Sequence, residues 1–134
     1  MDPPPRPGVD WLGWFLPRSL VRRPPRTTSL APPHPDDLIR LDELRRLGSR
    51  LDLQHPVRSF VTFDDEVATR AARDRLEEDG YRCQVRHEAG AWTLTAIAPL
   101  VPTPQTLTRL REHLLEVCGP LAGSVRGWEA PVVH

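Results

Sequence analysis

The chain of 134 residues contains no lysine and no asparagine, and it has only two cysteines and one methionine. All 18 basic residues are therefore arginines, and 18 acidic residues balance them. A net charge of zero does not indicate a nucleic-acid or membrane partner for the chain as a whole. We attribute the missing lysine to coding bias first, although arginine makes better bidentate contacts and suits a recognition surface.

The two cysteines, Cys83 and Cys118, do not form a CxxC pair, and no two histidines have the spacing of metal ligands. We therefore expect no metal site, and we expect both thiols to be buried and reduced, since nothing indicates secretion. No apolar run reaches the ~18 residues of a membrane span. The start of the chain also lacks the features of a signal peptide. These absences predict a cytoplasmic protein with no membrane partner.

Residues for catalysis are also missing from the sequence. Ser59 and Ser124 have no visible base or GxSxG elbow, and no glycine-rich loop could hold a phosphate. The acidic cluster Asp64-Asp65-Glu66 could serve as a metal site or a general base, but capping of a helix accounts for all three residues. We therefore predict a protein that is not an enzyme, with no catalytic residues and no cofactor.

The composition changes near residue 35. Ten of the 16 prolines and five arginines fall in residues 1–35, which predicts an extended basic leader ahead of a domain over residues 36–134. Within the leader, Trp11, Trp14 and Phe15 form an aromatic patch, which is unusual for a disordered segment. We expect this patch to dock on its own domain first; a partner-binding motif and contact with a membrane surface are the alternatives.

Downstream of the leader, the hydrophobic pattern predicts one helix followed by strand, helix, strand, strand, helix and strand. The first helix covers residues 36–47, with a predicted apolar stripe of Leu38, Leu41, Leu44 and Leu47. The order of the remaining elements is that of an α+β, ferredoxin-like two-layer sandwich with a four-stranded antiparallel sheet. The predicted elements cover residues 57–63, 66–79, 81–87, 91–98, 104–118 and 125–132.

Two helices would cover one face of such a sheet. In the first we expect Val67, Ala68, Ala71, Ala72 and Leu76 to face the sheet, and in the second Leu107, Leu110, Leu114, Val117 and Cys118.

The other face of the sheet would stay open. By alternation, the side chains on it would be Arg58, Phe60, Thr62, Arg82, Gln84, Arg86, Arg126 and Trp128. RNA-recognition modules stack bases on such a face. The segment 60–63 is similar to the end of their RNP1 pattern, but it lies on the first strand rather than the third. We therefore favour a protein partner or covering by the leader, with direct RNA binding as the alternative.

An ordered set of short motifs resembles the ribonuclease E inhibitor B (RraB) family over residues 44–132. The set begins with Leu47-Gly48-Ser49-Arg50-Leu51-Asp52 and Phe63-Asp64-Asp65-Glu66, continues with Ala71-Ala72, Leu76, Gly80-Tyr81 and Trp92-Thr93-Leu94, and closes with Gly123 and Gly127-Trp128-Glu129. The family usually has an aspartate before Gly-Trp-Glu, where this chain has Arg126. The resemblance implies a ferredoxin-like domain that binds ribonuclease E and restrains its cleavage of RNA.

Together these observations predict a non-enzymatic regulator that binds a ribonuclease E/G-type enzyme. An RNA- or ligand-binding module and a self-assembling domain are the alternatives, and in the latter the sheets of two chains would pair as a homo-oligomer. The candidate partner-binding residues are Phe60, Arg82, Arg86, Arg126, Trp128 and Glu129, with Trp11, Trp14 and Phe15 of the leader. For Trp128 and Gly127 a purely structural role is the competing interpretation: Trp128 could pin the last strand, and Gly127 could permit close packing or a bulge.

Overall fold

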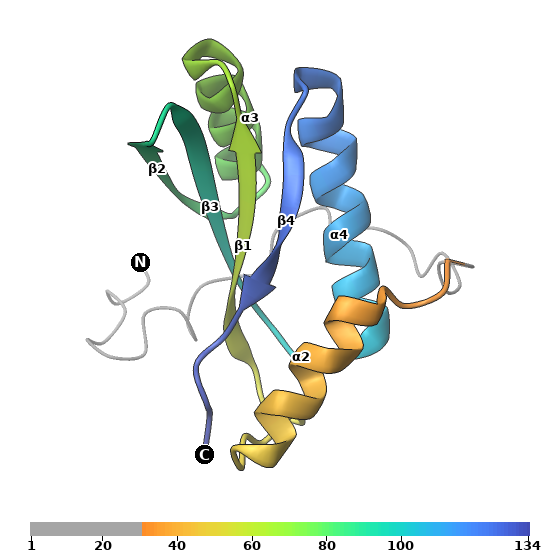
Figure 1. The fold of residues 1–134 in the computed structure, drawn as a ribbon. Helices are drawn as coiled ribbons and strands as arrows, with labels where there is room; N and C mark the ends of the chain where they lie inside the picture. Colours follow the sequence, from red (N-terminus) through yellow and green to blue (C-terminus); the bar gives the residue numbers. More distant parts are fainter. Residues whose placement is uncertain (1–30) are drawn as a thin grey trace, which may run out of the picture.

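The computed structural model describes residues 31–134. This part of the chain contains three α-helices and four strands, whose arrangement can be followed in Figure 1. The predicted aromatic patch of Trp11, Trp14 and Phe15 lies outside the described residues, so its docking stays a prediction. The elements are α2 (Pro35–Arg46), β1 (His55–Phe63), α3 (Glu66–Glu78), β2 (Arg82–Glu88), β3 (Ala91–Leu100), α4 (Pro104–Cys118), the short 3₁₀ helix η1 (Gly119–Leu121) and β4 (Ser124–Glu129).

The four strands form one antiparallel sheet in the order β2-β3-β1-β4. The predicted α+β class and the predicted sequence of elements are confirmed. The ends of the elements differ by a few residues from the prediction. The last strand ends at Glu129 rather than at residue 132, and the segment after it instead bonds to the loop that follows α2 through Val133.

Helices α3 and α4 pack on one face of the sheet, which we call the covered face (Figure 1). Alternate residues of β1 point into this core, and Val57, Val61 and Phe63 are buried there. Leu94, Ala96, Ala98 and Leu100 of β3 are buried against them. Burial of these apolar side chains is the main source of stability for the domain.

The two covering helices start at residues that can cap them. The Asp65 carboxylate accepts a hydrogen bond from the backbone N–H of Ala68 at the start of α3. Thr103 and Thr106 form a reciprocal capping box at the start of α4, with Pro104 in the first turn. Such caps satisfy backbone donors that a helix leaves free. Both starts are where the sequence predicts them.

Two of the predicted apolar stripes are partly wrong. In α2, Leu38 and Leu47 are exposed, and the buried residues are Asp37, Leu41 and Leu44. In α3, Val67 and Ala71 are exposed, while Thr69 is buried and donates its hydroxyl to the backbone carbonyl of Asp65. A polar residue can take a buried position when a specific partner satisfies it, and hydrophobicity alone does not reveal that partner. The stripe predicted for α4 is confirmed.

Candidate functional site: the open face of the sheet

The face of the sheet opposite α3 and α4 carries no helix within residues 31–134 and is here called the open face (Figure 1). Phe60 and Ile97 are half-buried near its middle, and Thr95 is enclosed by its cross-strand neighbours Phe60 and Gln84. Four exposed arginines surround them, one from β1, two from β2 and one from β4: Arg58, Arg82, Arg86 and Arg126. The sequence therefore placed Phe60 and these arginines on the correct face.

A β-bulge changes the facing of side chains along β4. The pairing with β1 shifts between Phe60 and Val61, so that Arg126 is the extra residue. Gly127 has φ of +144°, in a region that favours glycine, although no atom lies within 4 Å of where a Cβ would be. A bulge that inserts one residue reverses the alternation of the residues on one side of it. The bulge interpretation of Gly127 is confirmed, and the close-packing one is not.

The placement of Trp128 on the open face is wrong. The bulge puts Trp128 opposite Ser59 on the covered face, where it is 6% exposed. Its indole N–H donates to Asp37 Oδ1 over 2.9 Å. Arg126 stays on the open face and donates its Nε–H to the hydroxyl of Thr62 over 2.9 Å. The structural role considered for Trp128, holding the last strand, is what the contacts show.

Asp37 joins α2 to the rest of the domain, a role that the sequence did not reveal. Its buried carboxylate accepts bonds from Trp128 and, over 2.7 Å, from Arg111 Nη2 of α4. An acidic residue in the first turn of a helix is usually explained by its favourable interaction with the helix dipole. The sequence therefore gives no sign that Asp37 also makes contacts with distant residues. Asp37 Oδ2 and Arg111 Nε have no hydrogen-bond partner. The three residues therefore form a buried polar contact between α2, α4 and β4.

A groove of about 550 Å³ lies at one end of the open face and receives residues from all four strands. Its apolar lining comes from Pro56, Ile97, Ala130 and Pro131, and its charged lining comes from Arg58, Arg82 and Glu129. Arg58 Nη1 lies 3.4 Å from Glu129 Oε1. The sequence-predicted residues Arg82 and Glu129 therefore lie on one groove, while Phe60, Arg86 and Arg126 lie elsewhere on the same face.

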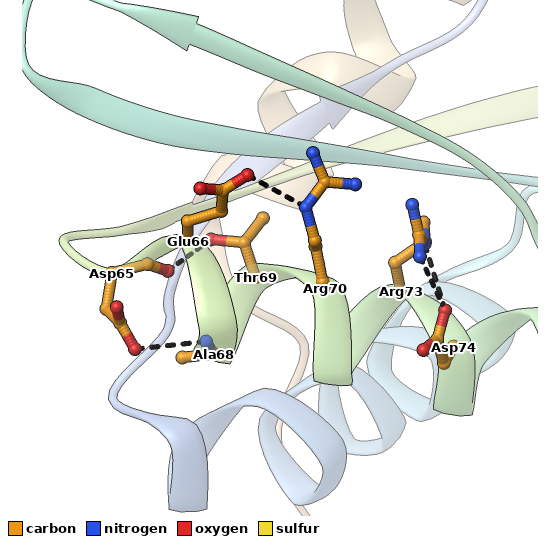
Figure 2. A network of polar contacts seen from close by, with 7 residues as sticks. All are labelled: Asp65, Glu66, Ala68, Thr69, Arg70, Arg73 and Asp74. Carbon is orange, nitrogen blue, oxygen red and sulfur yellow. Dashed lines mark hydrogen bonds and ion pairs between the residues drawn. The ribbon is translucent and has the colours of Figure 1, made fainter.

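Two of the three residues in the acidic cluster at the start of α3 have a structural role. The capping prediction is confirmed for Asp65, whereas Glu66 forms an ion pair on the helix surface. Figure 2 shows Asp65 bonded to the backbone of Ala68 and Glu66 paired with Arg70. The Arg70 Nε to Glu66 Oε2 distance is 2.9 Å, which is a favourable i,i+4 pair on the helix surface. One turn further along, Arg73 pairs with Asp74.

Two other buried polar clusters connect segments that are far apart in the sequence. The hydroxyl of Ser49 donates to His55 Nε2 over 2.6 Å, and the same oxygen accepts from the backbone N–H of Val133. This ties the end of the chain to the loop after α2. The hydroxyl of Tyr81 bonds to His113 Nδ1, and His113 Nε2 bonds to Asp79, each over 2.9 Å. The second cluster connects α4 with the end of α3.

Both cysteines are free thiols, as predicted, and Cys118 is buried. The prediction of burial is only partly right for Cys83, which is partly buried on β2. Burial raises the pKa of the Cys83 thiol to about 12, and burial likewise raises the pKa of the Cys118 thiol to about 11. Thiols with such values are almost wholly protonated near neutral pH, and a protonated thiol is a poor nucleophile and metal ligand.

In the part of the chain that the structure describes, no three His, Cys, Asp or Glu side chains are grouped as metal ligands. Nor does any helix between residues 31 and 134 have the length and apolar character needed to cross a membrane.

The fold and the site define an α+β domain whose candidate site is a basic, partly apolar sheet surface. The protein belongs to the family described as regulator of ribonuclease activity B, whose model matches residues 37–130. The matched range includes Asp37, Arg111 and Trp128, which join α2 to the core, and all four strands. The resemblance found in the short sequence motifs is thus confirmed. No curated protein and no solved structure matches the chain.

Proposed function

We propose that the protein is a non-enzymatic regulator that binds a ribonuclease E/G-type enzyme through its open face and slows cleavage of RNA. Membership of a family of regulators of ribonuclease activity is the observation that carries this proposal. The open face supports it, because Phe60 and Ile97 are half-buried rather than covered and exposed arginines surround them. Protein interfaces commonly combine an apolar centre with an arginine-containing rim.

We also assign the fold to the ferredoxin-like class as part of this proposal. The strand order β2-β3-β1-β4 supports the assignment, as do α3 and α4, which connect the strands on one face. In this arrangement the opposite face carries neither α3 nor α4 within residues 31–134, so a partner can reach its side chains. We place the protein in the cytoplasm, where its proposed target acts on transcripts.

The test is a cleavage assay with the full chain and a purified ribonuclease E/G-type enzyme from the same cell. We expect the chain to slow cleavage of a test RNA at a near-stoichiometric ratio, and to co-purify with the enzyme. If the chain changes cleavage by none of the endoribonucleases of that cell, the proposed function is wrong.

A further inference from the structure

We propose that the groove at the end of the open face binds an acidic segment of protein that inserts an aliphatic or aromatic side chain. This inference rests on the proposed function, because the segment is taken to belong to the regulated ribonuclease. It adds the chemistry of the contact, which the family description does not give.

The shape and lining of the groove call for a short extended segment with an apolar side chain. The groove crosses from β2 to β4, and four strands spaced by ~4.8 Å span about 14 Å. At ~3.3 Å per residue, that width matches roughly four extended residues. The floor of Pro56, Ile97, Ala130 and Pro131 offers no hydrogen-bonding side chain. An apolar guest is favoured there because its burial releases water.

The charges of the open face call for an acidic segment. Among the strand residues of the open face, Arg58, Arg82, Arg86 and Arg126 outnumber the two glutamates, Glu88 and Glu129. Of these arginines, Arg126 also lines a pocket with Asp36 and Glu43 of α2, so the positive charge nearest the groove is that of Arg58 and Arg82. Both glutamates are already paired, Glu129 with Arg58 at 3.4 Å and Glu88 with Arg86 at 3.9 Å. Complementary charge of this kind raises the rate and the specificity of association.

The Arg58–Glu129 pair at the edge of the groove can exchange partners. The two side chains are 48% and 55% exposed. Exposed pairs of this kind contribute only ~0–1 kcal/mol. A carboxylate from an arriving segment can therefore take the place of Glu129 beside Arg58. It follows that Glu129 weakens binding of an acidic segment and that Arg58 strengthens it.

A protein segment fits the open face better than single-stranded RNA does. Proteins that bind single strands stack the bases on several aromatic side chains. Within the described residues the open face has one aromatic side chain, Phe60, since Phe63, Trp92 and Trp128 pack on the covered side.

The experiment measures binding of a fluorescent peptide to the full chain by anisotropy. The probe is the acetylated, amidated peptide Glu-Leu-Asp-Phe-Glu-Leu-Asp. The comparison probes are the same peptide with lysine in place of every acidic residue, and single-stranded oligouridylate. We expect the acidic peptide to bind most tightly, and its affinity to fall as salt is added.

Substitutions at the exchanging pair give opposite effects. We expect Arg58→Gln to weaken binding of the acidic peptide roughly three- to fivefold, and Glu129→Gln to tighten it about twofold, as the energy of an exposed pair implies. The control is Arg70→Gln in α3, because Arg70 is also 48% exposed and also paired with a glutamate. We expect the control variant to bind as the unchanged chain does.

Three outcomes would overturn the inference: equal weakening by Arg58→Gln and Arg70→Gln, equal binding of the lysine peptide, or binding of the oligouridylate in preference to both peptides. The cleavage assay separates this failure from failure of the proposed function. If the chain slows the ribonuclease but does not bind the acidic peptide, only the inference about the groove is wrong. If the peptide binds but no ribonuclease is slowed, the groove stands and the proposed target is wrong.

Discussion

The covered and open faces of the sheet come from the same four strands, yet their side chains differ in burial and in their contribution to stability. On β3, Leu94 is completely buried beneath the helices, and Ile97 on the open face is half-buried. The covered face is closed by helices on which its packing depends. The open face keeps apolar and charged groups that are only partly buried or exposed, so they should contribute less to stability. Side chains that contribute little to stability are available for binding, so the comparison shows where to look for the function.

The largest expected effect compares the two faces on a single strand. Leu94→Ala should reduce the free energy of unfolding by about 2–5 kcal/mol, because it removes buried contacts and leaves a cavity. Ile97→Ala should cost only ~1 kcal/mol, because the side chain is already partly in water. Urea denaturation of the two variants measures both values. Equal losses would mean that the open face is covered in the native protein.

The second effect tests whether α2 is held by Asp37. Asp37→Ala should lower the free energy of unfolding by about 2–3 kcal/mol, because Arg111 and Trp128 both lose their acceptor in a buried place. The matched control is Asp36→Ala, one residue earlier, whose side chain is 72% exposed. We expect the control to change stability by less than ~0.5 kcal/mol. A similar loss in both variants would assign the effect to the helix dipole instead.

The third effect concerns close packing at the start of β4. A Cβ at Gly123 would lie 2.6 Å from the Phe63 ring and 2.9 Å from the Cys118 Cβ. Gly123→Ala should therefore cost about 1–3 kcal/mol through overpacking. Gly119→Ala is the control, since nothing lies within 4 Å of its Cβ position. The measurement is the melting temperature of each variant. Equal melting temperatures for Gly123→Ala and Gly119→Ala would contradict the close contact at Gly123.

The smallest effect is chemical and concerns the two thiols, Cys83 on the covered side of β2 and Cys118 at the end of α4. Because burial raises the pKa of Cys83 to about 12 and that of Cys118 to about 11, both should react slowly with a disulfide reagent near pH 8. Unfolding in urea should restore fast reaction. A rapid reaction of the native protein would contradict the raised pKa values.

The same pKa values predict how stability depends on pH. Because the folded-state pKa of each thiol exceeds the ordinary 9.0, the contribution of the protonated thiols to stability is fully present below pH 9. This contribution is lost as the pH rises through 11 to 12.

Most of the fold could be predicted because it depends on local and periodic signals. Asp65, Thr103 and Pro104 mark helix starts, and alternation along β1 and β2 separates the two faces correctly. The facing of Trp128 could not be predicted, since one inserted residue in a bulge reverses it and alternation carries no sign of the bulge. Gly127 before the tryptophan did suggest a bulge, but it did not show between which residues the register shifts, and the facing of Trp128 depends on that.

The polar contacts were the least predictable part of the site. Asp37 looks like any acidic residue in a first helical turn, and its partners Arg111 and Trp128 are 74 and 91 residues away in the chain. The pairing of Arg58 with Glu129 likewise depends on the register between β1 and β4. Such contacts follow from the assembled fold and leave no local pattern.

The central claim is that the open face, and not the solvent surface of α3, contacts the ribonuclease. It is tested most directly by the RNA cleavage assay with two matched double variants of the full chain. One changes Phe60 and Arg82 to alanine on the open face, and the other changes Val67 and Arg70 to alanine on α3, where Val67 is 75% exposed. We predict that the first variant stays folded but no longer slows cleavage, and that the second slows it normally. Normal inhibition by the open-face variant, with loss of inhibition in the α3 variant, would contradict the claim.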